Sequence, residues 1–489
     1  MSISETIPQF FCCISDMRRF LFSVVYFLCL SVFFAQTLEE TYAQIEAIPE
    51  EYQTVINSDF SNLTDEQLFE YFIILSGDYG RKDELLTYYK EKAAEADALI
   101  AESFSQAELK SHSDDVVYRV ADFINQTTHS VFFKSYNRIC FTASELKDYK
   151  RYDCVSASIM YSILLTRNKV KFTPIETTDH VLVKVDLSDK SVDVETTNYY
   201  GFDPGTKKEF KANFSKTTGF TYVNAQKYHL RRDIDTKQMF SLVLQNRISL
   251  LTQKKKYMEA AELAYMYKLM RGDEEGDKSY NSALYNLAGY LSAENNRKKE
   301  FEESLRWIQI CPENQNKHAL LNNVLLSIAN HADKTGDYEQ GFANLELALN
   351  YGWSETTPEY VRFRKMLVNN TVAGLIKKQS YDEARGLIVA EREKKIVPAA
   401  DLNKMLKSVT TSECGLLYQD KNYEEAILKT AECLQLMPND QVLTNNLKVF
   451  FIEYVEYLKA SDPEKAAQIV AEAKKRFPSD KAFSQLLAD

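Results

Sequence analysis

The hydrophobic positions in the second half of the chain repeat with the period of an α-helix. From residue 239 to 489, apolar helical stretches alternate with polar turns, and a recurring marker opens every second stretch. The marker is an aromatic residue, or once a proline, ahead of an acidic and alanine-rich run: Tyr257, Phe301, Tyr338, Tyr381, Tyr423 and Pro463. Successive markers lie about 40 residues apart. The pattern predicts a series of helical hairpins that bury their apolar faces on one another.

A different pattern occupies the middle of the chain. Asp153 is a good helix N-cap residue, and the apolar positions that follow Cys154 are spaced for a helix with one buried face. Residues 170–175 and 180–186 then have strand-like patterns. In the second of them valines alternate with other side chains, so the valines share one face and His180 lies on the other.

A short polar loop joins this strand to a third strand-like segment, residues 191–197. If the loop holds an even number of residues, an antiparallel hairpin pairs even positions of one strand with odd positions of the next. Asp193 and Glu195 then share a face with His180. The hairpin is therefore expected to bring an imidazole and a carboxylate into a pocket with Cys154.

The N-terminal part of the chain contains an apolar run and a helical segment. Residues 20–35 are uninterrupted apolar sequence after Arg18 and Arg19. The run is short for a membrane span, which needs about 20 residues, and its basic flank is typical of a secretory signal. Residues 1–35 are therefore predicted to be a signal peptide or, if uncleaved, a membrane anchor. Residues 36–105 have helical spacing and carry no recognisable chemistry.

Charge and composition exclude several classes of function. The net charge of −11 argues against a nucleic-acid-binding protein, which would carry a basic surface. The histidines are scattered and no Cys-x-x-Cys pair is present, so no metal site is predicted. No glycine-rich phosphate loop occurs, and no cofactor is expected. Membrane contact is expected only through the N-terminal apolar run, and only if that run is not cleaved.

Loss of the leader would leave an odd number of cysteines. The cysteines after residue 35 are Cys140, Cys154, Cys311, Cys414 and Cys433. They cannot all pair with one another, and one free thiol is what a cysteine nucleophile outside the cytoplasm requires. Those in the helical repeats are expected to pack on apolar helix faces.

Cys154, His180 and an acid form a candidate catalytic group. A thiol in the first turn of a helix benefits from the helix dipole and from free backbone N–H groups, which favour the nucleophilic thiolate. A histidine can accept the thiol proton, and a carboxylate on its other ring nitrogen fixes its tautomer. Cys154 is expected to be the nucleophile, His180 the base and then acid, and Glu195 the orienting acid, with Asp193 as its competitor. His129, on a helix upstream, is expected to be structural.

These residues resemble the transglutaminase-like branch of the papain-like superfamily. That family carries Cys at a helix start, His at the start of a following strand and Asp on the next strand, often before Pro-Thr; here Glu195 precedes Thr196 and Thr197. The resemblance implies an α+β transglutaminase-like core at residues 106–238. The C-terminal pattern resembles degenerate tetratricopeptide repeats, which implies an all-α solenoid at residues 239–489.

Together these resemblances predict an exported thiol-dependent acyl-transfer enzyme, located in the periplasm or cell envelope. Its reaction would be that of a peptidase, an amidase or a cross-linking transglutaminase, and the helical repeats would bind a protein or peptide partner. The alternative is a non-catalytic interaction protein in which a degenerate transglutaminase-like domain accompanies binding repeats.

Overall fold

The computed structural model describes residues 37–111, 113–205, 207–219 and 231–486. Contacts divide the chain into two units, Met1–Leu287 and Ala288–Asp489. The predicted leader, residues 1–35, lies outside the described residues. Within the described ranges, no helix combines the length and the apolarity that crossing a membrane requires.

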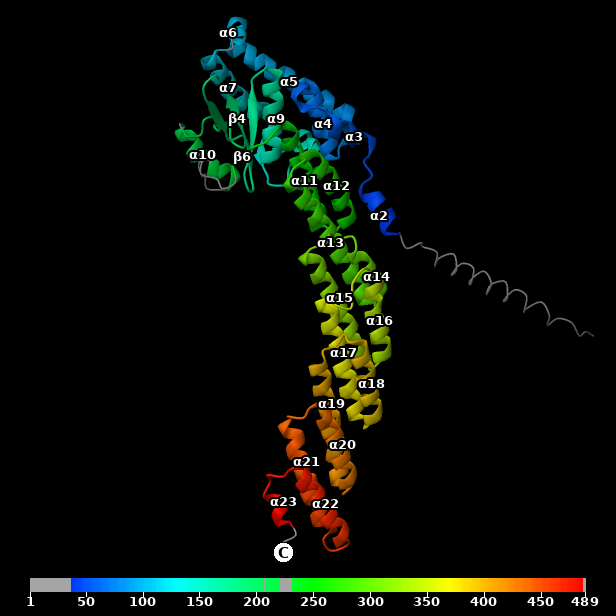
Figure 1. Cartoon of the computed structure of the whole chain (residues 1–489). Coiled ribbons are helices and arrows are strands. Elements are labelled where there is room, and N and C mark those ends of the chain that lie inside the picture. The colour runs from blue at the N-terminus through cyan, green and yellow to red at the C-terminus, as the bar shows by residue number, and fades with distance from the viewer. Residues whose placement is uncertain (1–36, 112, 206, 220–230, 487–489) are drawn as a thin grey trace, which may run out of the picture. The chain divides into compact units, whose positions relative to one another are not determined.

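The first unit is built mainly from helices (Figure 1). Its described helices are α2 (Leu38–Ile45), α3 (Glu50–Asn57), α4 (Asp65–Ser76), α5 (Lys82–Ser103), α6 (Gln106–Ser111), α7 (Asp114–Phe132), α8 (Ala143–Tyr149), α9 (Cys154–Arg167), α10 (Lys208–Thr218), α11 (Thr236–Gln253) and α12 (Tyr257–Arg271), with the 3-10 turns η1 (Phe60–Asn62) and η2 (Tyr79–Arg81). The start of α4 is fixed by the Thr64 side chain, which accepts a hydrogen bond from the Gln67 amide in a reciprocal capping box. Helix α13 (Glu274–Lys298) runs across the division between the units.

In the described part of this unit, two small sheets lie among the helices. Strands β1 (Ser135–Tyr136) and β2 (Arg151–Tyr152) pair in parallel. The other sheet has the antiparallel order β5-β4-β3-β6 and consists of β3 (Phe172–Glu176), β4 (Val181–Asp186), β5 (Ser191–Val194) and β6 (Arg232–Asp233). Lys184 of β4 pairs with Asp193 of β5, which is the predicted even-to-odd parity. The strands differ from their predicted ranges, because β4 begins after His180 and β5 ends before Glu195.

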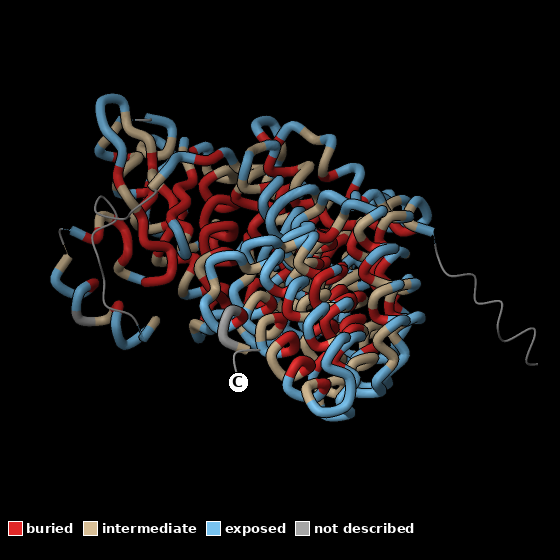
Figure 2. The backbone as a smooth tube through the Cα atoms, turned by 60° about the horizontal axis from the view of Figure 1, so that its bottom comes forward, coloured by how far each residue is buried: buried red, intermediate tan, exposed pale blue. Residues whose placement is uncertain are grey.

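Helix α9 is the central packing element of the first unit. Every residue from Val155 to Leu165 is buried, as expected of a helix enclosed on all sides. It packs against β3 and β4 of the sheet and against α4, α7 and α11. Figure 2 shows that buried positions, in red, gather inside the molecule, while exposed positions lie on the outer turns. Cys154, the first residue of this helix, is therefore positioned by the close packing of the residues that follow it.

The predicted α+β transglutaminase-like core is wrong. The chain is predominantly helical, and the strands of its largest sheet contain only 5, 6, 4 and 2 residues. The alternating pattern between residues 170 and 197 identified real strands. Its extension to a whole domain failed because α7, α8, α9 and α10 occupy most of the described remainder of residues 106–238.

The second unit is a stack of helical hairpins, seen as successive paired helices in Figure 1. After the end of α13 its helices are α14 (Phe301–Ile308), α15 (Gln315–Thr335), α16 (Tyr338–Asn350), α17 (Pro358–Lys377), α18 (Tyr381–Lys394), α19 (Ala399–Gln419), α20 (Tyr423–Leu436), α21 (Gln441–Leu458), α22 (Pro463–Arg476) and α23 (Ala482–Gln485). Consecutive helices pack together, and α15, α17, α19 and α21 also contact one another in turn. Each predicted marker is the first residue of a helix, from Tyr257 in α12 to Pro463 in α22.

The predicted start of the repeat region falls within α11 of the first unit. Helix α11 packs against α12, α4, α9 and β3, and α12 contacts α2 and α3. The division between the compact units lies later, after Leu287. A boundary at residue 238 would therefore separate α9 and the sheet from a helix that covers them.

Candidate functional site

Cys154 occupies the first position of α9 because Asp153 caps that helix. The Asp153 Oδ1 atom accepts a hydrogen bond from the Ser156 amide at 2.9 Å, and the Ser156 Oγ atom accepts one from the Asp153 amide at 2.9 Å. Asp153 is 1% exposed, whereas Cys154 is partly exposed. The thiol thus lies at the dipole-positive end of the helix, beside backbone N–H groups that have no acceptor within it.

His180 lies directly before β4, in the tight connection from β3. The Thr177 amide donates to the His180 carbonyl oxygen at 2.9 Å, which fixes this turn. The Nε2 atom of His180 lies 2.9 Å from Oε2 and 3.1 Å from Oε1 of Glu195. The Cys154 side chain lies close enough to His180 to raise the pKa of the imidazole. Because Glu195 occupies Nε2, the nitrogen that remains for the thiol is Nδ1.

The surroundings of His180 favour its charged form. Burial lowers the pKa of His180, but the negative charge of Glu195 and the hydrogen bonds with Cys154 and Glu195 outweigh burial and raise it well above the ordinary value. For Glu195 burial raises the pKa, while the His180 charge and two Thr197 hydrogen bonds lower it overall. Thr197 Oγ1 donates to Glu195 Oε1 at 2.6 Å. The arrangement supports an imidazolium between a carboxylate and a sulfur atom.

Glu195 is held by a turn that continues from the end of β5. Its side chain is 2% exposed. Tyr152 Oη donates to the Thr197 carbonyl oxygen at 3.1 Å, and the Asn125 side chain donates to the Asn198 carbonyl oxygen at 3.1 Å. The carboxylate that orients His180 is therefore fixed by contacts with β2 and α7.

Asp193 is positioned differently from Glu195. Its two carboxylate oxygens accept hydrogen bonds from Arg231 at 2.7 and 3.0 Å. Of the two acids predicted to compete for His180, the structure places Glu195 against the imidazole and places Asp193 in an ion pair. The parity argument alone could not separate them, since both lie on the predicted face.

His129 contacts the backbone next to Glu195. Its Nε2 atom lies 3.0 Å from the Thr196 carbonyl oxygen, and its ring packs edge-on against Tyr152 and Phe133. Burial lowers the pKa of His129 to about 4, so the ring is neutral near pH 7 and donates to that carbonyl. This contact holds the residue that follows Glu195.

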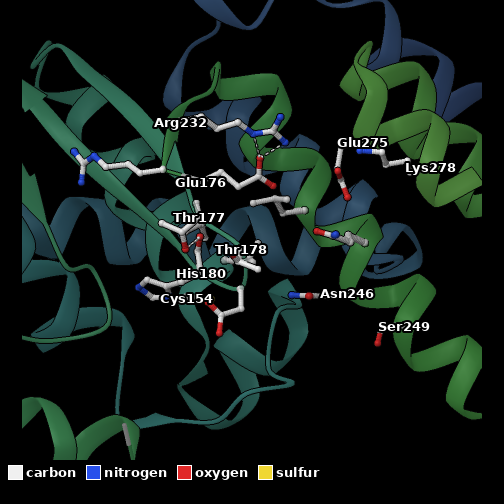
Figure 3. A pocket seen from close by; sticks show the side chains of 16 residues that line it. Cys154, Glu176, Thr177, Thr178, His180, Arg232, Asn246, Ser249, Glu275 and Lys278 are labelled. Carbon is white, nitrogen blue, oxygen red and sulfur yellow. Dashed lines mark hydrogen bonds and ion pairs between the residues drawn. The ribbon is translucent and has the colours of Figure 1, made fainter. Parts of the chain in front are cut away.

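A cavity of about 720 Å³ opens beside Cys154 and His180. Figure 3 shows its walls, which come from the β3–β4 connection, the segment at β6, and helices α11 and α13. The lining includes Glu176, Arg231, Arg232, Leu242, Asn246 and Lys278. At one wall, Glu176 binds Arg232 at 2.8 Å and the fully buried Arg271 at 2.9 Å, which ties the sheet to α12.

Sequence reasoning missed the contribution of α11 to this cavity. Gln245, Asn246 and Ser249 all line it. They form a polar strip on a helix whose preceding residues, from Met239 to Leu244, are buried. The polar strip could have indicated that this face of α11 lines a pocket, but the sequence does not show which distant residues form that pocket.

The five described cysteines, among them Cys140, Cys311, Cys414 and Cys433, are free, and all but Cys154 are buried. Among the residues that the structure describes, no group of three or more His, Cys, Asp or Glu side chains is arranged to hold a metal ion.

Comparisons with known proteins assign no family. No family model matches the sequence, and no curated protein matches it significantly. A solved structure described as "Crystal structure of menin reveals the binding site for Mixed Lineage Leukemia (MLL) protein" aligns over 83% of this chain and 98% of that chain, with 14% identity and a TM-score of 0.27. At this TM-score the likeness supports no inference about fold, partner or activity.

Proposed function

We propose that this chain is a thiol-dependent acyl-transfer enzyme with Cys154 as nucleophile. One observation carries the proposal: Cys154 and His180 line one cavity of about 720 Å³, and the Nε2 atom of His180 lies 2.9 Å from Glu195 Oε2. Thiol, imidazole and carboxylate in this order are the groups that acyl transfer through a thioester requires. The proposal rests on this chemistry and not on the fold class predicted from the sequence.

The first half of the reaction acylates Cys154. His180 takes the thiol proton, and the resulting imidazolium is stabilised by Glu195. The sulfur attacks the carbonyl carbon of an ester or amide, and the electron pair of the C=O double bond moves to oxygen. When that pair returns, the bond to the leaving group breaks and His180 donates its proton to the leaving oxygen or nitrogen. The product is a Cys154 thioester.

The second half transfers the acyl group to an acceptor. His180 removes a proton from water or from an amine, whose oxygen or nitrogen then attacks the thioester carbon and displaces the thiolate. Water gives hydrolysis, as in a peptidase or amidase, and an amine gives cross-linking. Both acceptors would react with the same thioester, so the proposal covers the two outcomes of one acyl-enzyme.

The second unit is proposed to bind a protein or peptide partner. Stacked helical hairpins offer extended surfaces whose common use is protein binding. We also propose that the protein acts outside the cytoplasm, on the basis of the apolar run that follows Arg18 and Arg19.

Alkylation of Cys154 by iodoacetamide tests the proposal in the full-length protein. Trypsin releases Cys154 in the peptide of residues 152–167, so its modification can be quantified by mass spectrometry separately from other cysteines. Wild type should be alkylated rapidly near pH 6, and His180→Ala should lose that advantage because no imidazolium then stabilises the thiolate. The control is His318→Ala, which replaces a histidine of the second unit and should behave as wild type.

Equal alkylation rates in wild type and His180→Ala across pH 5 to 8 would contradict the proposed enzymatic function. The chain would then be better described as an interaction protein whose Cys154 is an ordinary thiol.

A further inference from the structure

Asn246 of α11 reaches the pocket from the side opposite the sheet. It lines the same cavity as Cys154 and His180. In Figure 3 its side-chain nitrogen is turned toward the part of the pocket where those two residues lie. No other role in the proposed reaction accounts for an amide side chain at this place.

The contact between Asn246 and Asp153 fixes the orientation of the amide. Asn246 Nδ2 donates to Asp153 Oδ2 at 3.2 Å, while the other carboxylate oxygen of Asp153 serves the cap of α9 through Ser156. Asp153 directly precedes Cys154, so the amide is tied to the chain segment that carries the nucleophile. A primary amide has two N–H groups, and the bond to Asp153 uses one of them.

A second donor lies next to the sulfur. Cys154 is the first residue of α9, and the backbone N–H groups of the first helical turn have no acceptor within the helix. A backbone N–H and a side-chain amide that converge beside a nucleophile are the parts of an oxyanion hole in acyl transfer.

We infer that Asn246 Nδ2 and the backbone amide of Cys154 bind the oxyanion of the tetrahedral intermediate. This inference rests on the proposed acyl-transfer function and adds to it the residue that stabilises the transition state. As the bond between sulfur and the carbonyl carbon forms, the displaced electron pair comes to rest on an oxygen directed toward α11. Asn246 is then a catalytic residue, and Asp153 is the positioning residue that holds it.

A purely structural role for Asn246 predicts different behaviour. If the amide served only to satisfy the buried carboxylate of Asp153, its loss would lower stability and disturb Cys154 in every reaction. An oxyanion donor matters only where an oxyanion forms. Alkylation by iodoacetamide displaces iodide from a saturated carbon and forms none, whereas acylation by p-nitrophenyl acetate passes through a tetrahedral oxyanion.

The test compares these two reactions in the full-length protein, with Cys154→Ala as the background for ester hydrolysis. Asn246→Ala should reduce the rate of p-nitrophenolate release on the order of 100-fold, as loss of one oxyanion donor does elsewhere. Its alkylation at Cys154 should stay at the wild-type rate. Gln253→Ala, an exposed position on the same helix outside the pocket, is the matched control and should change neither reaction.

Asn246→Ser covers the case in which the alanine variant unfolds. Serine is a small polar side chain that is too short to place a donor at the position of Nδ2, so acylation should fall while folding is kept. Wild-type acylation rates in either folded variant would overturn the inference and leave the proposed function standing. Equal loss of alkylation and acylation would also overturn it, since that pattern marks a structural role. Failure of the proposed function is separate, because it is read from the alkylation of His180→Ala.

Discussion

Gly201 lies so close to Glu195 that a β-carbon built on Gly201 would be 1.9 Å from the Glu195 carbonyl oxygen. The same pair is joined by a hydrogen bond of 2.8 Å from the Glu195 amide to the Gly201 carbonyl oxygen. A turn from residue 195 to residue 201 is closed by this contact, and it sets the backbone of the acid that orients His180. Any side chain at position 201 must move that backbone.

Gly201→Ala is therefore expected to disable the site. Overpacking of this kind costs about 1–3 kcal/mol of stability, and here the obstructing atom is backbone and cannot turn away. Thermal unfolding should occur at a lower temperature, and the rapid alkylation of Cys154 should be lost with it. Gly205→Ala is the control, because nothing described lies within 4 Å of a β-carbon at that position. Normal alkylation in Gly201→Ala would show that the turn does not set Glu195.

Glu195→Gln keeps the shape of the side chain and removes its charge. Burial lowers the pKa of His180, and the Glu195 charge is the largest of the causes that raise it. Without that charge the pKa of His180 falls, so the imidazolium is lost at a lower pH. Alkylation of Cys154, followed from pH 5 to 9, should slow near neutral pH and recover only under alkaline conditions.

Asp193→Asn is the matched control for this charge removal. Asp193 is held by Arg231 and does not contact His180, so its alkylation profile should match that of wild type. A shift of equal size in both variants would mean that net charge in the region, and not the Glu195 contact, governs His180.

His129 should make the protein sensitive to acid. Burial lowers its pKa to about 4, below the value of about 6.5 in an unfolded chain. The stability contributed by the neutral ring is thus present above pH 6.5 and is lost as pH falls toward 4. The free energy of unfolding, measured with urea, should fall between pH 7 and pH 4.5 in the wild type. In His129→Gln, whose amide can still donate to the Thr196 carbonyl oxygen, this fall should be smaller by on the order of 2 kcal/mol. An identical loss in both proteins would contradict this assignment.

In the second unit, Arg364 and Glu391 form a buried ion pair. Their contacts measure 2.8 and 2.9 Å, and the two side chains are 1% and 2% exposed. Removal of one partner leaves a buried charge, so Glu391→Ala should cost about 3–5 kcal/mol. Asp382→Asn, which breaks the exposed pair with Arg385, should cost about 0–1 kcal/mol. Denaturant unfolding of both variants checks the difference, and similar costs would refute it.

Local patterns in the sequence were sufficient for the parts of the site that depend on neighbours in the chain. Asp153 caps α9 as its residue type and position indicated, and the strand parity was confirmed by the pairing of Lys184 with Asp193. The helix starts at Tyr338 and Tyr423 were equally local, since each follows a polar turn.

The remaining features depend on contacts between distant segments. Asp193 and Glu195 differ in role because Asp193 binds Arg231, which lies 38 residues further along the chain. Asn246 likewise binds Asp153 across a sequence separation of 93 residues. The hydrophobic pattern within one segment cannot predict a contact with a distant segment. The fold class failed for the same reason, because the pattern of a few short strands does not reveal how many helices enclose them.

The exposure of its cysteines gives this molecule a simple chemical vulnerability. Cys140, Cys311, Cys414 and Cys433 are buried, so among the described thiols a mild oxidant meets Cys154 first. Peroxide would convert that sulfur to a sulfenic acid, which thiol reductants reverse, while the protein core stays intact. The same selectivity makes Cys154 an attachment point for a fluorescent probe, whose emission would report when the cavity fills.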